Sequence, residues 1–398
     1  MFKILKIENI SIVFILPTFA IGSFYDERLE ISGINLSIIF SIFFILGLLF
    51  QLKNKSNSNI KSVLFLLILS IITFTFVQWT FYEYNIANKY SFNKLIVLTL
   101  ITFPISFFIT NLNTQQKIKD FLILTSAIGL FLSILGVIQV ITSGGGESRL
   151  SVLGGGPIVF SRWVGFFMIV LIFIYKLSVL KKSLIIILCL SLMILSGSKG
   201  PLFFIFLTIF IIFFKKNKIL IFASILILVI FFILFPLTDY LHNIPILKRI
   251  LGLEESANII HGTSSSARIN LIFESFESIS MNPFGYGLGN FTKYSDKNSI
   301  LGPTGYPHNF LLEVFLELGF PFLLIILIIS FKIIVYIYKT IRYNSEFTNI
   351  KKAIFSVWIF YFLNSMVSGD VSDARFLIIF TTIIFVIKQQ NNKQFFNK

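Results

Sequence analysis

Long apolar runs recur along almost the whole chain and constrain its fold more than any other feature. Each run covers about 15–22 residues, close to the roughly 20 residues that an α-helix needs to cross a bilayer. Charged residues make up only 13% of the 398 residues, whereas soluble domains carry about 25%. One soluble core could not bury this much apolar surface. The sequence therefore predicts an all-α fold, a polytopic integral membrane protein.

The apolar runs and the polar breaks between them predict about twelve transmembrane helices. The expected spans lie near 8–24, 32–52, 60–79, 93–111, 120–142, 158–178, 183–197, 201–214, 218–236, 308–338, 353–369 and 374–388. The seventh and eighth are short, and the residues between them predict a tight hairpin. We expect Gly319 and Pro321 to break the long tenth span into a short helix followed by a full span, because proline lacks the helical N–H.

Basic residues occur in every second loop. These loops and both termini carry 21 of the 33 Lys and Arg but only three of the 18 Asp and Glu. By the positive-inside rule, they lie in the cytoplasm. The net charge of +15 is therefore a signal of topology, and secondarily an attraction to anionic lipid, rather than a nucleic-acid footprint. We expect a multi-pass protein of the cytoplasmic (inner) membrane, with both termini cytoplasmic and no nucleic-acid partner.

One long polar segment, 237–306 between spans 9 and 10, is expected to be a loop on the outer, periplasmic side. It holds His242 and His261, and the third histidine, His308, follows at its exit. None of the three has the i, i+4 spacing typical of a metal site. The glycines of 285–289 follow no expected strand, so a turn is favoured over a nucleotide loop. We expect no metal and no cofactor, and we interpret the two loop histidines as solvated.

Cationic residues near the outer membrane level are candidates for an anion site, because a charge in hydrocarbon is costly and is usually kept for function. These residues are Arg149, Arg162, Lys199 and Arg268. Together they would suit a phosphate or diphosphate whose lipid tail stays in the bilayer. The simpler interpretation of each is snorkelling at the interface or a structural ion pair. The same two interpretations apply to the outer turn that holds Asp370, Asp373 and Arg375.

His308 stands at the start of a predicted helix, directly behind Pro307. As a neutral imidazole it would remove a proton from an attacking hydroxyl, because histidine titrates near neutral pH. Its alternative role is to cap the helix. Glu313 and Glu317 follow on the same short apolar helix, where they would orient a base, bind sugar hydroxyls or form a buried structural pair.

Three groups of residues, in order along the chain, resemble the superfamily of bacterial O-antigen ligases and O-antigen polymerases. Residues 195–200 (LSGSKG) are similar to the family's Ser-Arg-Gly hairpin. Residues 266–268 (SAR), followed by 282–291 (NPFGYGLGNF), resemble its arginine and the "Pro-x-Gly-x-Gly" segment after it. Residues 307–319 (PHNFLLEVFLELG) resemble its His-Asn-x-x-Leu-Glu helix and the following Glu-x-Gly. The resemblance is strong from about residue 149 to about residue 375.

The resemblance implies a metal-independent glycosyltransferase that uses a polyprenyl-diphosphate-linked glycan as its donor. His308 would then activate the acceptor hydroxyl, while Arg268 and Lys199 would bind the diphosphate of the donor. One departure is that the family's hairpin usually bears arginine. Lys199 keeps the charge but lacks the two-pronged guanidinium, so Arg149 or Arg162 would share the diphosphate.

The same resemblance gives supporting roles to Glu313, Asp370 and Asp373. It also divides the chain into N-terminal transmembrane helices, 1–142, and an O-antigen ligase-like membrane region, 143–398, that includes the outer loop.

Three functions remain open at this point. We favour a polymerase that joins lipid-linked oligosaccharide repeats into O-antigen or capsular polysaccharide. A ligase that transfers finished glycan to lipid A-core or protein is the closest alternative, and a flippase for lipid-linked glycan is the more distant one. The expected partners are the polyprenyl-diphosphate-linked donor, the glycan acceptor and membrane lipid, together with a flippase and a chain-length regulator.

Overall fold

The protein's computed structural model describes residues 30–31, 34–35, 58–81, 94–95, 97–112, 114–143, 149–153, 155–213, 264–290, 307–343, 347–371 and 373–396. Most of these residues are helical. The exception in secondary structure is one antiparallel pair of two-residue strands, β1 (Glu30–Ile31) and β2 (Ile34–Asn35). The helices are α3 (Ser58–Phe81), the π-helix η4 (Val97–Thr102), α5 (Phe103–Ile109), α6 (Gln115–Ser143), α7 (Gly156–Phe173), α8 (Val179–Leu195), α9 (Lys199–Phe213), α12 (Ser264–Met281), α15 (Phe310–Tyr343), α16 (Asn349–Ser365) and α17 (Arg375–Phe396).

Described helices overlap nine of the predicted spans in sequence. Three of them, at Gln115–Thr142, Gly156–Phe173 and Phe310–Tyr343, are long and apolar enough to cross a membrane. The predicted spans 8–24 and 218–236 lie outside the described residues. Of 32–52 only Ile34–Asn35 is described, and it is strand rather than helix. The chain is an integral membrane protein, while the number of twelve spans stays a prediction.

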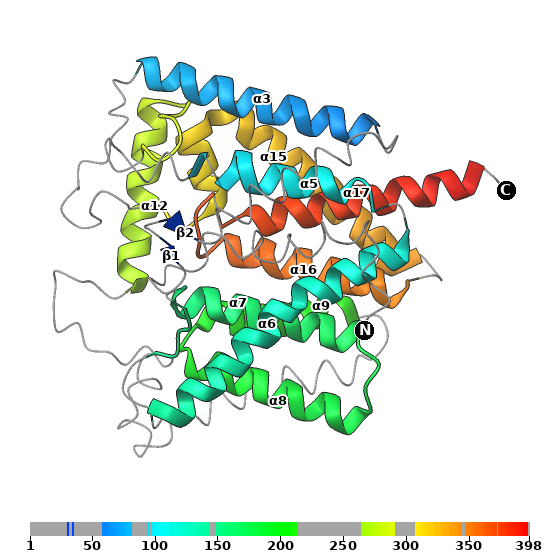
Figure 1. The fold of residues 1–398 in the computed structure, drawn as a ribbon. Helices are drawn as coiled ribbons and strands as arrows, with labels where there is room; N and C mark the ends of the chain where they lie inside the picture. The colour runs from blue at the N-terminus through cyan, green and yellow to red at the C-terminus, as the bar shows by residue number, and fades with distance from the viewer. Residues whose placement is uncertain are drawn as a thin grey trace.

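The predicted outer loop is not loop throughout. Residues 264–281 form α12 instead, because apolar and small residues recur one helical turn apart and bury one face. On that face Leu271 and Ile279 pack with Leu316 of α15. In Figure 1, α12 crosses the end of the molecule where α15 begins, rather than running along the other helices.

The other long helices lie side by side, with α7 and α16 in the interior (Figure 1). Trp163 and Phe166 of α7 are buried and face aromatic rings from α16 and α17. Tyr361 and Phe376 stack with their centroids 4.4 Å apart. Because successive helices alternate in direction, the α8–α9 hairpin, the start of α15 and the α16–α17 turn meet at one end. We call this the hairpin end.

The long helix α15 is broken at Gly319, as predicted. Gly319 has φ 79° and ψ 178°, and Pro321 follows two residues later. Proline has no N–H, so the carbonyl of Glu317 loses its helical donor. The segment after α12 supplies the missing partners: Gly287 N donates to Glu317 O at 2.9 Å, and Phe320 N donates to Pro283 O at 2.9 Å. Without these hydrogen bonds, each unpaired peptide group at the break would cost free energy in apolar surroundings.

Two glycines allow the segment after α12 to approach this break. A Cβ on Gly319 would lie 2.3 Å from Phe284 O, and a Cβ on Gly285 would lie 2.6 Å from Gly319 N. Both glycines also have positive φ, which L-residues rarely adopt. The glycine-rich segment is therefore a turn that docks on α15, as the sequence predicts.

We expect Gly319→Ala to lower the melting temperature of the purified protein clearly, because it adds both a clash and backbone strain of about 1–3 kcal/mol. Gly200→Ala is the matched control: its Cβ would meet Val367 at 3.6 Å, an ordinary contact, and φ is not positive there. Thermal unfolding in detergent compares the two. Equal melting of both variants would contradict the docking role of Gly319.

Candidate functional site

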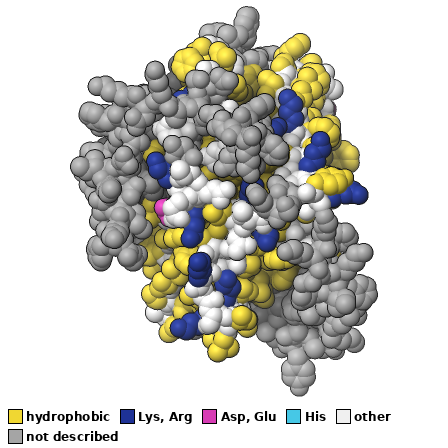
Figure 2. All heavy atoms as spheres, turned by 90° about the vertical axis from the view of Figure 1, so that its right-hand side faces the viewer, with side chains coloured by type: hydrophobic (Ala, Val, Ile, Leu, Met, Phe, Trp, Pro, Cys, Tyr) yellow, Lys and Arg dark blue, Asp and Glu magenta, His cyan; other side chains and the backbone are white. Residues whose placement is uncertain are grey.

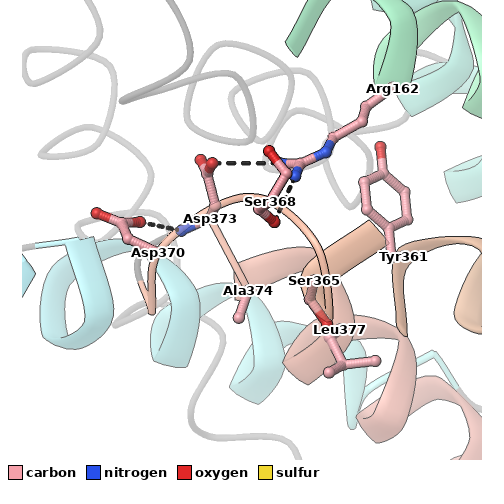
Figure 3. Close-up of a pocket in the computed structure, with 8 residues that line it drawn as sticks. All are labelled: Arg162, Tyr361, Ser365, Ser368, Asp370, Asp373, Ala374 and Leu377. Atoms are coloured by element: carbon pink, nitrogen blue, oxygen red, sulfur yellow. Dashed lines mark hydrogen bonds and ion pairs between the residues drawn. The ribbon is translucent and has the colours of Figure 1, made fainter. Parts of the chain in front are cut away.

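Two consecutive residues of α7 hold the hairpin end together. The hydroxyls of Ser161 and Ser196 are 2.5 Å apart, which joins α7 to the α8–α9 hairpin. Arg162 donates from Nη1 to Asp373 Oδ2 at 3.2 Å and from Nη2 to Ser368 O at 2.6 Å (Figure 3). Because these residues are neighbours on one helix, α7 fixes the hairpin and the α16–α17 turn relative to each other.

A small cavity lies beside this ion pair. Its lining residues are Arg162, Tyr361, Ser365, Ser368, Asp370, Asp373, Ala374 and Leu377. Asp373 turns toward Arg162, whereas the Asp370 side chain points away from that guanidinium and accepts from Asp373 N at 2.8 Å (Figure 3). Burial raises the pKa of the Asp373 carboxyl, and the charge of Arg162 opposes that rise. Arg162 is only 7% exposed. Its contacts with Asp373 and Ser368 O are those of a structural ion pair.

Arg149 is also bound to protein acceptors. Its Nε donates to Ser196 O at 3.0 Å, and its Nη2 donates to Gly197 O at 3.2 Å and to Ser198 Oγ at 3.3 Å. A cation at the end of a helix satisfies the last carbonyls and interacts well with the helix dipole. Arg149 therefore stabilises the tight hairpin that the sequence predicts. The next residue of that hairpin, Lys199, begins α9 and is exposed.

His308 lies at the entrance of α15 in an uncommon backbone conformation. Its φ is +55°, a region that few residues other than glycine adopt. Asn309 rather than His308 caps the helix, because its Oδ1 accepts from Leu311 N at 3.0 Å and from Leu312 N at 3.1 Å. Asn309 Nδ2 also donates to Met366 O at 3.0 Å. The histidine is therefore held beside the α16–α17 turn.

The two glutamates of α15 form a buried cluster with Lys94, a partner that was not predicted from the sequence. Lys94 bonds to Glu313 Oε1 and, at 2.6 Å, to Glu317 Oε1. All three side chains are at most 1% exposed, and the negative charge of Asp370 also acts on Glu313. Of the predicted roles, the buried structural pair matches this geometry, with a lysine added. The signal in the sequence that could have indicated this cluster is a lysine at the start of one apolar run and two glutamates within another.

The structure thus gathers most of the predicted site residues at the hairpin end, but in separate groups. Arg162 is joined to Asp373, Arg149 to the hairpin before Lys199, and Glu313 to Lys94. Arg268 lies in α12, one turn before Leu271, and its side chain lies outside the described part of the chain. The predicted loop residues His242 and His261 also lie outside it.

Comparison with known proteins adds one finding. A protein-family model described as O-antigen ligase matches residues 184–327. This match contains most of α8, all of α9 and α12 and the first half of α15, and so includes Lys199, Arg268 and His308. No curated protein matches the chain. The resemblance seen in the sequence is confirmed for this region, and it points to a function of the O-antigen ligase or polymerase type.

We expect Lys94→Met to destabilise the protein by about 3–5 kcal/mol, because removing one member of a buried ion cluster leaves uncompensated carboxyls. Adding Glu313→Gln and Glu317→Gln to the same chain should recover part of the loss. Lys339→Met, at an exposed position of α15, is the control. The measurement is thermal unfolding of purified protein. Unchanged melting of Lys94→Met would show that the cluster contributes no stability.

Proposed function

We propose that this chain, whose residues 184–327 are similar to the O-antigen ligase family, is a membrane glycosyltransferase that polymerises polyprenyl-diphosphate-linked oligosaccharide repeats. The product would be O-antigen or capsular polysaccharide, made on the outer face of the cytoplasmic membrane. We place the active site at the hairpin end, facing the periplasm. The N-terminal helices, 1–142, would form one membrane region and 143–398 the ligase-like region.

The observation that carries this proposal is the position of His308. It stands inside the matched region, and the neighbouring Asn309 ties it to the α16–α17 turn through Met366. That turn is in turn held by Arg162 of α7. A general base must be fixed within hydrogen-bond reach of the proton that it removes. The bonds of Asn309 supply this kind of positioning for the backbone of His308.

In the proposed reaction, His308 accepts the proton of a hydroxyl on the acceptor glycan. The hydroxyl oxygen forms a bond to the anomeric carbon of the donor sugar, with inversion, while the bond from that carbon to the diphosphate oxygen breaks. The polyprenyl diphosphate leaves with the electron pair of that bond. Arg268 and Lys199 would stabilise its negative charge, as cations commonly do for phosphate groups. No metal is required in this scheme.

The remaining site residues would act through others. Arg149 would shape the hairpin that presents Lys199, and Arg162 with Asp373 would hold the turn beside His308. Arg149 and Arg162 donate to protein acceptors. We assign the main diphosphate contacts to Arg268 and Lys199 because these two cations stand in the segments that resemble the family's arginine and hairpin motifs. Glu313 would fix the first turns of α15 through Lys94, and Asp370 supports the same turn through Asp373 N.

A ligase is the second candidate, because the matching family model carries the description O-antigen ligase. It would use the same lipid-linked donor and the same base, but would pass finished glycan to lipid A-core or to protein. The expected flippase and chain-length regulator would accompany the polymerase. The chemistry at the anomeric carbon is common to both candidates, so the acceptor alone distinguishes them.

We expect His308→Ala to lower the rate of transfer by about 10²–10⁴-fold, the usual contribution of a general base. In cells, long surface glycan chains should disappear while single repeats still reach the surface. His261→Ala is the matched control, because this histidine is interpreted as solvated. Gel analysis of the surface polysaccharide measures the outcome. Long chains that accumulate on the carrier lipid would indicate the ligase, and normal glycan would overturn the role of His308.

A second prediction concerns the hairpin cation. Lys199→Ala should weaken donor use about tenfold or more, because a charge-assisted bond to phosphate is lost. Lys199→Arg should keep or raise activity, since arginine stands at this position in the family that the hairpin resembles. Chain-length distributions and protein amounts are compared for both variants. If Lys199→Ala made wild-type polysaccharide, the diphosphate contact would have to be assigned elsewhere.

A further inference from the structure

A second cavity lies at the end of the helix assembly opposite the hairpin end. It measures about 420 Å³ and is lined by Lys119, Ile172, Phe173, Ile174, Tyr175, Lys176, Leu177, Lys182, Thr348, Asn349 and Ile350. Its walls come from α6, from the end of α7 and the start of α8, and from the start of α16. Its volume falls within the range of about 300–1,000 Å³ that is typical of small-ligand sites.

Three lysines from three different segments converge on this cavity. Lys119 belongs to α6, Lys176 to the connection after α7, and Lys182 to α8. Lys182 Nζ donates to Ile172 O at 3.1 Å, which holds that ammonium at the wall. An ammonium group has three donors, so Lys182 retains donors for a ligand. Convergence from separate elements distinguishes this arrangement from a row of lysines on one exposed helix face.

The fourth wall adds positive charge from the backbone. Thr348, Asn349 and Ile350 form the start of α16, a helix of 17 residues, and the side chain of Thr348 caps it by accepting from Lys351 N. The N-terminus of a helix carries partial positive charge and free N–H donors, which favour bound anions. No acidic residue lines the cavity, and within the described residues no carboxylate forms an ion pair with Lys119, Lys176 or Lys182.

The surroundings of the cavity are basic as well. Figure 2 shows this end of the molecule, where Lys and Arg far outnumber acidic side chains among the coloured residues. Lys351 and Lys352 follow the cavity wall on α16. Leu177, which lines the cavity, is exposed, and so are Val179 and Leu180, which lie in the sequence between Leu177 and Lys182. A ligand here would thus meet positive charge and apolar surface together.

We propose that this cavity binds a phosphate group, carried by an anionic lipid headgroup or by a soluble phosphate ester. Three ammonium groups and one helix N-terminus match a phosphate, whose oxygens accept several charge-assisted bonds at once. The apolar rim favours the lipid, whose acyl chains would lie along α8. This site is separate from the proposed transferase site, lies at the other end of the helices, and requires no catalytic residue.

The test compares two double variants with the same change in charge. Lys119→Gln with Lys182→Gln removes two lysines of the cavity. Lys117→Gln with Lys181→Gln removes two exposed lysines that neighbour them on the same helices but do not line the cavity. Native mass spectrometry of the purified full chain measures binding of phosphatidylglycerol, with phosphatidylcholine as the neutral lipid and glycerol 3-phosphate as the soluble ester. Melting without lipid checks that both variants fold.

We expect one saturable phosphatidylglycerol site, weakened roughly tenfold or more by the cavity pair and less than threefold by the control pair. If glycerol 3-phosphate competes only weakly with phosphatidylglycerol, the ligand is the lipid. If glycerol 3-phosphate binds as tightly as phosphatidylglycerol, the ligand is the soluble ester. Both results support the phosphate site. Equal weakening by the two pairs would show diffuse surface attraction and would overturn the proposal, as would equal binding of phosphatidylcholine.

Discussion

Polar groups buried within an apolar helix assembly must find their partners inside the protein, and the hairpin end of this molecule depends on that constraint. The break at Gly319 leaves peptide groups that the segment after α12 satisfies. Arg149 satisfies the carbonyls at the α8–α9 hairpin, and Arg162 satisfies Ser368 O together with Asp373. Each such bond also fixes one element relative to another. The architecture of the site is therefore largely a consequence of backbone satisfaction.

Much of this fold could be predicted, because a long run of apolar residues in the sequence predicts a membrane helix. The break at Gly319 and Pro321, the hairpin before Lys199 and the turn near Gly285 follow from local chemistry that the sequence displays directly. The residues of helix α12 were predicted only as part of an outer loop. Its true extent depends on packing of Leu271 against Leu316, a contact between residues 45 positions apart that no local pattern reveals.

The site was less predictable for the same reason. Lys94 is separated from Glu313 by 219 positions. No pattern near either residue in the sequence indicates that the two side chains are in contact. The functions of Arg149 and Arg162 were left open between anion binding and structural bonds, and the geometry shows the structural bonds. His308 was correctly placed at the start of a helix, but the cap is Asn309. Sequence patterns identified which residues are candidates, whereas their contact partners could be identified only from the fold.

The Lys94 cluster has a consequence for how the chain is made. Synthesis proceeds from the N-terminus, so Lys94 leaves the ribosome 219 residues before Glu313. At a synthesis rate of about 5–20 residues per second, about ten seconds or more pass between the synthesis of Lys94 and that of its acidic partners. During that interval the ammonium has not yet met Glu313 and Glu317, and a lysine is disfavoured within an apolar span, by about 3 kcal/mol at its centre. The arrival of α15 thus completes the burial of an element synthesised long before it.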